Sequence, residues 1–451
     1  MKLLPGISQL RLRPLLVMGE LLLIAALAYM ASRNELLLIL ILPVGVGVVL
    51  TFLRWPALGL MAAMVAGIVV PFFGPSGLNA TMILIALMLG LWLLDIMVRR
   101  GQTEFVPSRP LWSLLSILVV AAFSFGFGLL PWLTFAVHAP LGAQLGGLSI
   151  VVLSAGTFLL AAYQVHDLRW LSTITWVFLA TGAFAVLLRS VLPAFGLPTR
   201  HLLPQVGTVF FIWLIAMAFS QAWLNTHLHR GWRLALGGLV FVTVYVLFVL
   251  KFADKSGWLS VFACIGAIVV ARSWRAALAL VPMAGLSALF MWSRLVSSDE
   301  YSISTRFDAW AIMARIIQIN PLWGLGFANY YWYTPLFPIR GYAVSFNSHN
   351  NYVDIVAQMG LVGLVCFFWL LWEVGWLAWG LRKQASTGFA RAYTYAVLGG
   401  LAGTIVAGML GDWVLPFFYN LGLNGFRSSM LGFLFFGGLV TIQQLELARR
   451  K

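Results

Sequence analysis

His349 is the residue of this sequence best suited to acid–base chemistry. It lies in the polar segment 348–352, at the point where a long apolar run begins. Because a histidine changes charge near neutral pH, it can act as a general base. Asn350 and Asn351 offer amide donors and acceptors for sugar hydroxyls or phosphate oxygens. Asp354, one helical turn further on, can orient such a site. The alternative is structural, since Asn350 also suits a helix cap.

Arg306, Lys255 and Arg200 lie in polar segments that we expect at the same membrane face as His349. A group of guanidinium and ammonium ions there suits an anionic ligand, above all a phosphate or a pyrophosphate. The alternative for each of them is a solvated loop charge or a pair with a nearby acid, such as Asp308 for Arg306. His201, beside Arg200, is a weaker histidine candidate than His349.

The composition indicates the kind of protein in which these candidate residues lie. Of the 451 residues, 62% are apolar and only 9% are charged, against about 25% charged in an ordinary soluble domain. The chain is therefore predicted to be an all-α polytopic membrane protein. The net charge of +15 comes from short cationic clusters between apolar runs. Such clusters are typical of loops that obey the positive-inside rule, and no segment resembles a nucleic-acid-binding module.

Apolar runs of about 20 residues predict 12 to 14 transmembrane helices. The expected spans are 14–31, 36–53, 56–73, 78–98, 111–130, 148–165, 170–192, 206–224, 234–250, 256–271, 276–293, 351–380, 391–411 and 428–446. The second and third of these are separated by two residues only, so they form either a tight hairpin or a re-entrant segment. With the N-terminus inside, 18 of the 28 lysines and arginines fall on one side, which places both termini in the cytoplasm and His349 at the outer face of the membrane.

The polar stretch 294–350 divides the chain into three predicted parts. Residues 1–293 form an N-terminal transmembrane bundle, 294–350 an outer loop that carries candidate active-site residues, and 351–451 the C-terminal transmembrane helices. The loop is expected to open with an amphipathic surface helix. Its apolar residues recur at helical spacing, namely Ile303, Phe307, Trp310, Ala314 and Ile317.

Two segments together resemble the membrane-embedded O-antigen ligase and O-antigen polymerase superfamily. The first runs from Arg306 through Trp310 to Asn320-Pro321 and a Gly-x-Gly at 324–326. The second is His349-Asn350, followed by a Gly-x-x-Gly at 360–363. The segment 254–258 resembles an upstream family motif in which Lys255 stands where Arg is usual, and Arg200 lies where a further arginine is expected.

The resemblance implies a glycosyltransferase of the bacterial inner membrane that works without metal or other cofactor at the periplasmic face, where the loop 294–350 would lie. Its donor would be a glycan linked to undecaprenyl pyrophosphate, held in contact with membrane lipid, and its acceptor a hydroxyl of the lipid A-core oligosaccharide. The family's essential groups fall on His349 and Arg306, and less firmly on Arg200 and Lys255. Asn350, Asn351, Trp310 and Asp354 complete the expected binding site. A single displacement with His349 as base would invert the sugar.

Three alternatives stay open at this point. The shared motifs fit a polymerase of lipid-linked repeat units nearly as well as a ligase. A flippase or transporter for the same lipids would need charged groups along the whole membrane path, and Glu20 and Glu373 are acids inside predicted spans. Transfer of glycan to protein is the third alternative.

Overall fold

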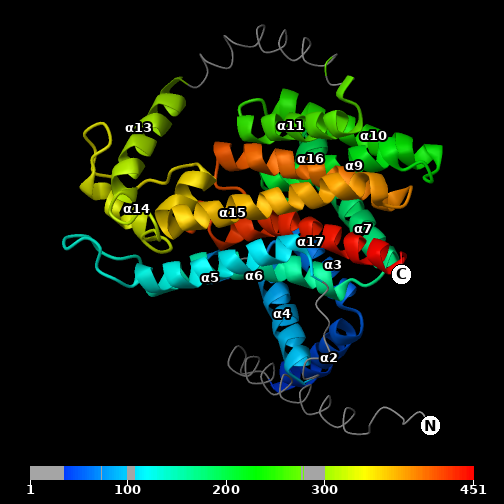
Figure 1. The fold of residues 1–451 in the computed structure, drawn as a ribbon, viewed down its shortest axis with the longest axis horizontal. Helices are drawn as coiled ribbons and strands as arrows, with labels where there is room; N and C mark the ends of the chain where they lie inside the picture. Colours follow the sequence, from blue (N-terminus) through cyan, green and yellow to red (C-terminus); the bar gives the residue numbers. More distant parts are fainter. Residues whose placement is uncertain (1–34, 73, 99–106, 276–277, 279–299, 451) are drawn as a thin grey trace.

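The computed structural model describes residues 35–72, 74–98, 107–275, 278 and 300–450. In these residues the chain is a bundle of long helices with no strand (Figure 1). Nine of the helices are long and apolar enough to cross a membrane, or ten if a sharply bent pair counts as one span. The prediction of an all-α polytopic membrane protein is thus confirmed.

The helices follow the apolar runs of the sequence. Their bounds are α2 Glu35–Arg54, α3 Pro56–Val69, α4 Ala80–Val98, α5 Arg109–Gly128, α6 Leu141–Gln164, α7 Leu168–Val186, α9 Thr208–Leu224, α10 Arg230–Tyr245, α11 Lys255–Arg272, α13 Glu300–Ile317, α14 Asn329–Tyr333, α15 Asn351–Gln384, α16 Phe389–Leu410 and α17 Phe426–Ala448. The buried core that joins them consists of apolar side chains from nearly every long helix. Two of the expected spans, 14–31 and 276–293, lie outside the described residues.

One bend between expected spans agrees with the prediction, and the start of one helix differs from it. Helices α2 and α3 meet at a bend of 119°, which fits the expectation of a tight hairpin or a re-entrant segment. The bend lies at Trp55-Pro56, where proline starts α3 and cannot continue α2. Helix α6 begins seven residues earlier than expected, at Leu141, because the small and amide residues before residue 148 are compatible with a helix that is buried on most sides.

The loops gather at two opposite ends of the bundle. Asn79 donates a hydrogen bond to the carbonyl of Leu423, and Asn329 donates one to that of Gly128, so these loops share the end that carries His349. At the other end Ser108 bonds Gln443, next to the C-terminus. Figure 1 shows α13 and α14 at one end of α15 and the C-terminus at the other. We call the first the His349 end.

Helix α15 is broken near its start by a loop that inserts beside it. Gly360 has the left-handed φ of 69° and interrupts the helix. The backbone groups that the break leaves free pair with segment 321–326, since Leu325 N donates to Ala357 O at 2.9 Å and Leu361 N donates to Pro321 O at 2.8 Å. Irregular backbone inside a bundle requires such partners. The Gly-x-x-Gly and Asn-Pro motifs therefore fix the short helix that follows His349.

Replacing Gly360 with alanine is expected to prevent folding. An alanine Cβ there would overlap the carbonyl of Leu322, and the positive φ adds strain. Together these should cost at least about 3 kcal/mol. The measurement is the yield of monodisperse protein in detergent size-exclusion chromatography. Gly380→Ala in the same helix is the control, because nothing lies near its Cβ, and a normal yield for Gly360→Ala would refute this explanation of the break.

The amphipathic helix of the polar stretch is present as α13, but its buried stripe is not the expected one. Phe307 is 61% exposed, and Ala314 is exposed too. The buried face is formed by Ala309, Ile312, Met313 and Ile316, which pack with Tyr330 and Phe417 in a separate small core. The stripe is rotated because the helix packs on α14 and α15, whose position the sequence pattern of α13 does not reveal.

Candidate functional site

His349 lies on a strained turn whose neighbours are fixed on both sides. Its backbone has the left-handed φ of 49°, which costs free energy in any residue but glycine. On one side, Trp310 Nε1 donates to the carbonyl of Ser348 at 2.8 Å. On the other, Asn350 caps α15 by accepting hydrogen bonds from Tyr352 N and Val353 N. The turn therefore presents the imidazole in one direction.

A buried polar network supports this turn from below. The hydroxyl of Ser348 lies 2.7 Å from Asp354 Oδ1, which also accepts a hydrogen bond from the hydroxyl of Tyr330 at 2.5 Å. Asp354 and Ser348 are both buried, so their mutual hydrogen bond is not replaced by water at low cost. Asp354 was expected to orient the site and to help bind substrate. Its hydrogen bond with Ser348 ties it to the turn that carries His349, which favours the orienting role, and the substrate contact stays a prediction.

Arg306 and Asp412 have opposite effects on the pKa of His349. Burial and the positive charge of Arg306 lower the pKa of His349 below its ordinary value, and the negative charge of Asp412 opposes them. In the described part of the protein the imidazole has no hydrogen-bond partner. A neutral imidazole with free nitrogens beside a guanidinium is a suitable proton acceptor for a ligand hydroxyl.

Asp412 was not identified from the sequence. It lies in the turn between α16 and α17, where its carboxylate accepts hydrogen bonds from Asn420 Nδ2 at 2.6 Å and from Phe417 N at 3.0 Å. Burial raises the pKa of this carboxyl, while those bonds and the charge of His349 lower it. An acid just after an apolar run, in Gly411-Asp412-Trp413, is the only sequence signal that pointed to it.

Asn350 and Asn351 use their amides within the protein. The Nδ2 of Asn350 donates to Met409 O at 3.2 Å. Asn351 donates to Leu415 O at 2.7 Å and accepts from Val414 N at 2.7 Å. Both side chains thus tie the start of α15 to segment 409–415. The expectation that they bind substrate stays a prediction, and their observed contacts favour the structural alternative.

Arg306 and Trp310 are placed close to the His349 turn by one face of α13. Arg306 Nη1 donates to the carbonyl of Leu410 at 3.2 Å, and the Trp310 bond to Ser348 has been described. Arg306 does not pair with Asp308, because Asp308 forms an ion pair with Arg340 at 2.7 Å. The guanidinium of Arg306 is consequently not neutralised by the acid that the sequence offered.

Arg200 and Lys255 lie on other segments at the same end of the bundle. Arg200 begins a single 3-10 turn, Arg200–Leu202, and is exposed. Lys255 is the first residue of α11. The structure therefore brings Arg306, Trp310, Asp354 and both asparagines around His349. Arg200 and Lys255 share this end of the bundle but lie on separate segments.

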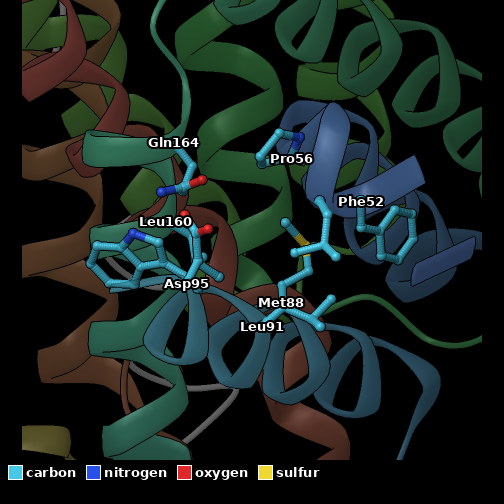
Figure 2. A pocket seen from close by; sticks show the side chains of 9 residues that line it. Phe52, Pro56, Met88, Leu91, Asp95, Leu160 and Gln164 are labelled. Carbon is cyan, nitrogen blue, oxygen red and sulfur yellow. The ribbon is translucent and has the colours of Figure 1, made fainter. Parts of the chain in front are cut away.

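The opposite end of the bundle carries a pocket and an ion pair that do not belong to this site. Figure 2 shows the pocket, in which Asp95 and Gln164 stand among apolar side chains of α2, α3, α4 and α6. Glu373, the described acid of the two that a transporter path was expected to use, pairs with Arg109 at 2.8 Å. Glu373 is therefore held in an ion pair, and it lies at the end of the bundle opposite the His349 site.

Comparison with known proteins agrees with this geometry. Residues 205–368 match the family model described as O-antigen ligase. This matched segment, the O-antigen ligase domain, spans 164 of the 451 residues. The domain includes Lys255, Arg306, His349 and Asp354, whereas Arg200 lies five residues before it and Asp412 lies 44 residues beyond its end. No curated protein matches the chain.

The O-antigen ligase domain supports the superfamily resemblance drawn from the sequence motifs. It supports glycan transfer of the ligase or polymerase type in general, on lipid-linked glycans, by a multi-pass membrane protein. Within the domain, the motif residues fall into two groups in the structure. Arg306 and Trp310 lie at the His349 turn, while the glycines and Asn320-Pro321 build the broken helix that holds this turn.

Proposed function

We propose that this protein transfers an O-antigen-type glycan from undecaprenyl pyrophosphate to a hydroxyl of the lipid A-core oligosaccharide. The observation that carries the proposal is the His349 turn. Within the described residues its imidazole has no hydrogen-bond partner, and the charges of Arg306 and Asp412 act on its pKa. The buried hydrogen bonds of Ser348, Asp354 and Tyr330 support the turn. The O-antigen ligase domain supplies the reaction class.

In the proposed step His349 takes the proton of the acceptor hydroxyl. The oxygen then attacks the anomeric carbon, and the bond from that carbon to the pyrophosphate breaks. The electron pair of the broken bond goes to the leaving phosphate oxygen, where nearby cations stabilise it. Attack opposite the leaving group inverts the sugar. Asp412 stabilises the imidazolium that forms when His349 is protonated, in the manner of an acid behind a catalytic histidine.

We further propose that the His349 end faces the periplasm of the inner membrane and that both termini are cytoplasmic. Arg109, Arg169 and Arg230 lie at the other end of the described bundle, which supports this orientation by the positive-inside rule. In the same proposal residues 1–293 form the N-terminal bundle, 294–350 the periplasmic active-site loop, and 351–451 the C-terminal helices.

The experiment that tests the proposed function is transfer by purified protein in proteoliposomes. Lipid-linked glycan is supplied with and without lipid A-core, and products are separated by mass. A ligase forms product only when core is present. Lengthening of the lipid-linked glycan without core would make the protein a polymerase instead. Movement of intact donor across the membrane, with no product in either case, would favour a transporter.

The pH dependence of transfer should shift in opposite directions in two variants. Because burial and Arg306 lower the pKa of His349 more than Asp412 raises it, the acid limb of the wild-type rate profile should lie below the ordinary histidine value of about 6.5. Arg306→Gln should move this limb to higher pH, and Asp412→Asn should move it to lower pH. The initial transfer rate from pH 4.5 to 8 measures both shifts. Identical acid limbs in all three proteins would contradict the assignment of His349 as the base.

A further inference from the structure

A group of aromatic side chains at the His349 end takes no part in the reaction proposed above. Tyr331 and Trp332 come from α14, and Phe418 and Tyr419 come from the segment between α16 and α17. The rings of Tyr331 and Tyr419 stack, with centroids 4.6 Å apart and planes inclined by 19°. Phe418 stands edge-on to Tyr419 at 5.3 Å, and Trp332 Nε1 donates a hydrogen bond to the Tyr419 hydroxyl at 2.8 Å. All four side chains are half-buried, and we call them the aromatic shelf.

The aromatic shelf is held in place by buried contacts. The buried rings of Tyr330 and Phe417 stack with centroids 4.6 Å apart, and the ring of Phe417 also lies 6.2 Å from that of Tyr331. Asn329, the first residue of α14, accepts a hydrogen bond from Ala139 N at 2.9 Å, which anchors α14 to the loop before α6. Rigid aromatic side chains offer a large contact area and lose little conformational entropy when a ligand binds.

The chemistry of the aromatic shelf suits an uncharged sugar. A sugar ring presents an apolar C–H face, which can pack on an aromatic ring, together with hydroxyls that need hydrogen-bond partners. The shelf offers stacked rings, and the hydroxyl of Tyr331 makes no hydrogen bond within the described part of the protein. A phosphate would instead require cations, and none of the four shelf residues is charged.

Two short connections join the aromatic shelf to the His349 site. On one side Asn420, next to the shelf in the sequence, donates to Asp412 Oδ1 at 2.6 Å. On the other side α14 reaches the His349 turn through the hydrogen bond of Tyr330 to Asp354. Because the acceptor hydroxyl has to meet the imidazole, the sugars next to that hydroxyl have to lie against the residues around this turn. The shelf is an aromatic surface at this place.

We infer that the aromatic shelf binds uncharged sugars of the acceptor oligosaccharide and so directs one of their hydroxyls to His349. The inference rests on the proposed function for the identity of the acceptor, the lipid A-core. It assigns the stacking contact with the acceptor to the paired rings of Tyr331 and Tyr419. The pyrophosphate of the donor lies elsewhere, because the shelf has no cation to hold it.

Binding without transfer tests this inference. The His349→Ala protein in nanodiscs is titrated calorimetrically with core oligosaccharide that has been freed of lipid A. Tyr331→Leu added to it should weaken the affinity about tenfold, the size of one lost stacking contact. Because the shelf is uncharged, this loss should be the same at low and at high salt. Tyr331→Phe keeps the ring and should stay within about threefold of the parent protein.

Tyr342→Leu is the matched control. Tyr342 is a tyrosine of the same polar stretch that is 71% exposed and lies outside the aromatic shelf, so its loss should leave the affinity for core oligosaccharide unchanged. In transfer assays with proteoliposomes, Tyr331→Leu in the otherwise wild-type protein should raise the KM for lipid A-core about tenfold and leave kcat unchanged. A folding defect would lower kcat instead, because it reduces the amount of active protein.

Three results would overturn the inference. Unchanged affinity for core oligosaccharide in both Tyr331→Leu and Tyr419→Leu would show that the rings are an interfacial belt. Weaker binding of the lipid-linked donor, with core binding unchanged, would show that the shelf holds the donor glycan. If core oligosaccharide did not bind even to the protein with an intact shelf, the acceptor named in the proposed function would itself be wrong, and the inference would fall with it.

Discussion

His349→Ala is expected to abolish glycan attachment while leaving the protein folded. Removing a general base typically costs about 10²- to 10⁴-fold in rate. The imidazole makes no hydrogen bond to the described part of the protein, so its loss breaks no structural contact. The measurement is the amount of glycan-bearing lipid A-core on gels, in cells that lack their own ligase and express the variant. Detergent size-exclusion chromatography checks that the protein level and shape are unchanged.

His201→Ala is the matched control for this variant. His201 is the other histidine that the sequence places beside a candidate phosphate-binding arginine, and the structure puts it on the 3-10 turn after Arg200. Attachment should continue at close to the wild-type level in His201→Ala. If His201→Ala lost attachment and His349→Ala kept it, the base would have been assigned to the wrong histidine.

Arg306→Gln is expected to have the second largest effect. Loss of a positive charge that stabilises a developing negative charge costs about 10²- to 10³-fold in rate. Arg306 also donates to Leu410 O, a bond that glutamine can retain in part, so the fold should survive. Arg306→Lys keeps the charge without the planar fork and should recover activity only partly.

Transfer rates and the thermal unfolding midpoint together distinguish a catalytic role of Arg306 from a structural one. Initial transfer rates with purified protein should fall in Arg306→Gln at saturating donor as well as at low donor, while the thermal unfolding midpoint stays within a few degrees of wild type. A large drop in the midpoint with normal rates at low temperature would show that Arg306 holds α13 to α16 and takes no part in the reaction.

Much of the candidate site was predictable because its residues lie in short segments. His349, Arg306 and Trp310 are close together in the structure since one surface helix and one helix start carry them. The apolar runs predicted the helices, because in a membrane the length and composition of a run fix its structure. The resemblance in order and spacing then pointed to the family that the O-antigen ligase domain supports.

The remaining features depend on contacts between distant segments. Asp412 reaches His349 only because segment 409–415 is tied to the start of α15 by Asn350 and Asn351. Those two asparagines suggested a sugar site by their type, whereas the structure uses them as such ties. The π-helical turns Leu187–Val191 and Val246–Leu250 leave no clear signal in the sequence.

The most direct test of the central claim is the fate of the donor with wild-type and His349→Ala protein in the same reconstitution. Donor carrying a labelled glycan is mixed with lipid A-core, and free undecaprenyl pyrophosphate and labelled core are followed together over time. The account predicts that both appear at equal rates with wild type and that neither appears with His349→Ala. Equal rates of product formation by the two proteins would contradict it, because the reaction would then not depend on the His349 site.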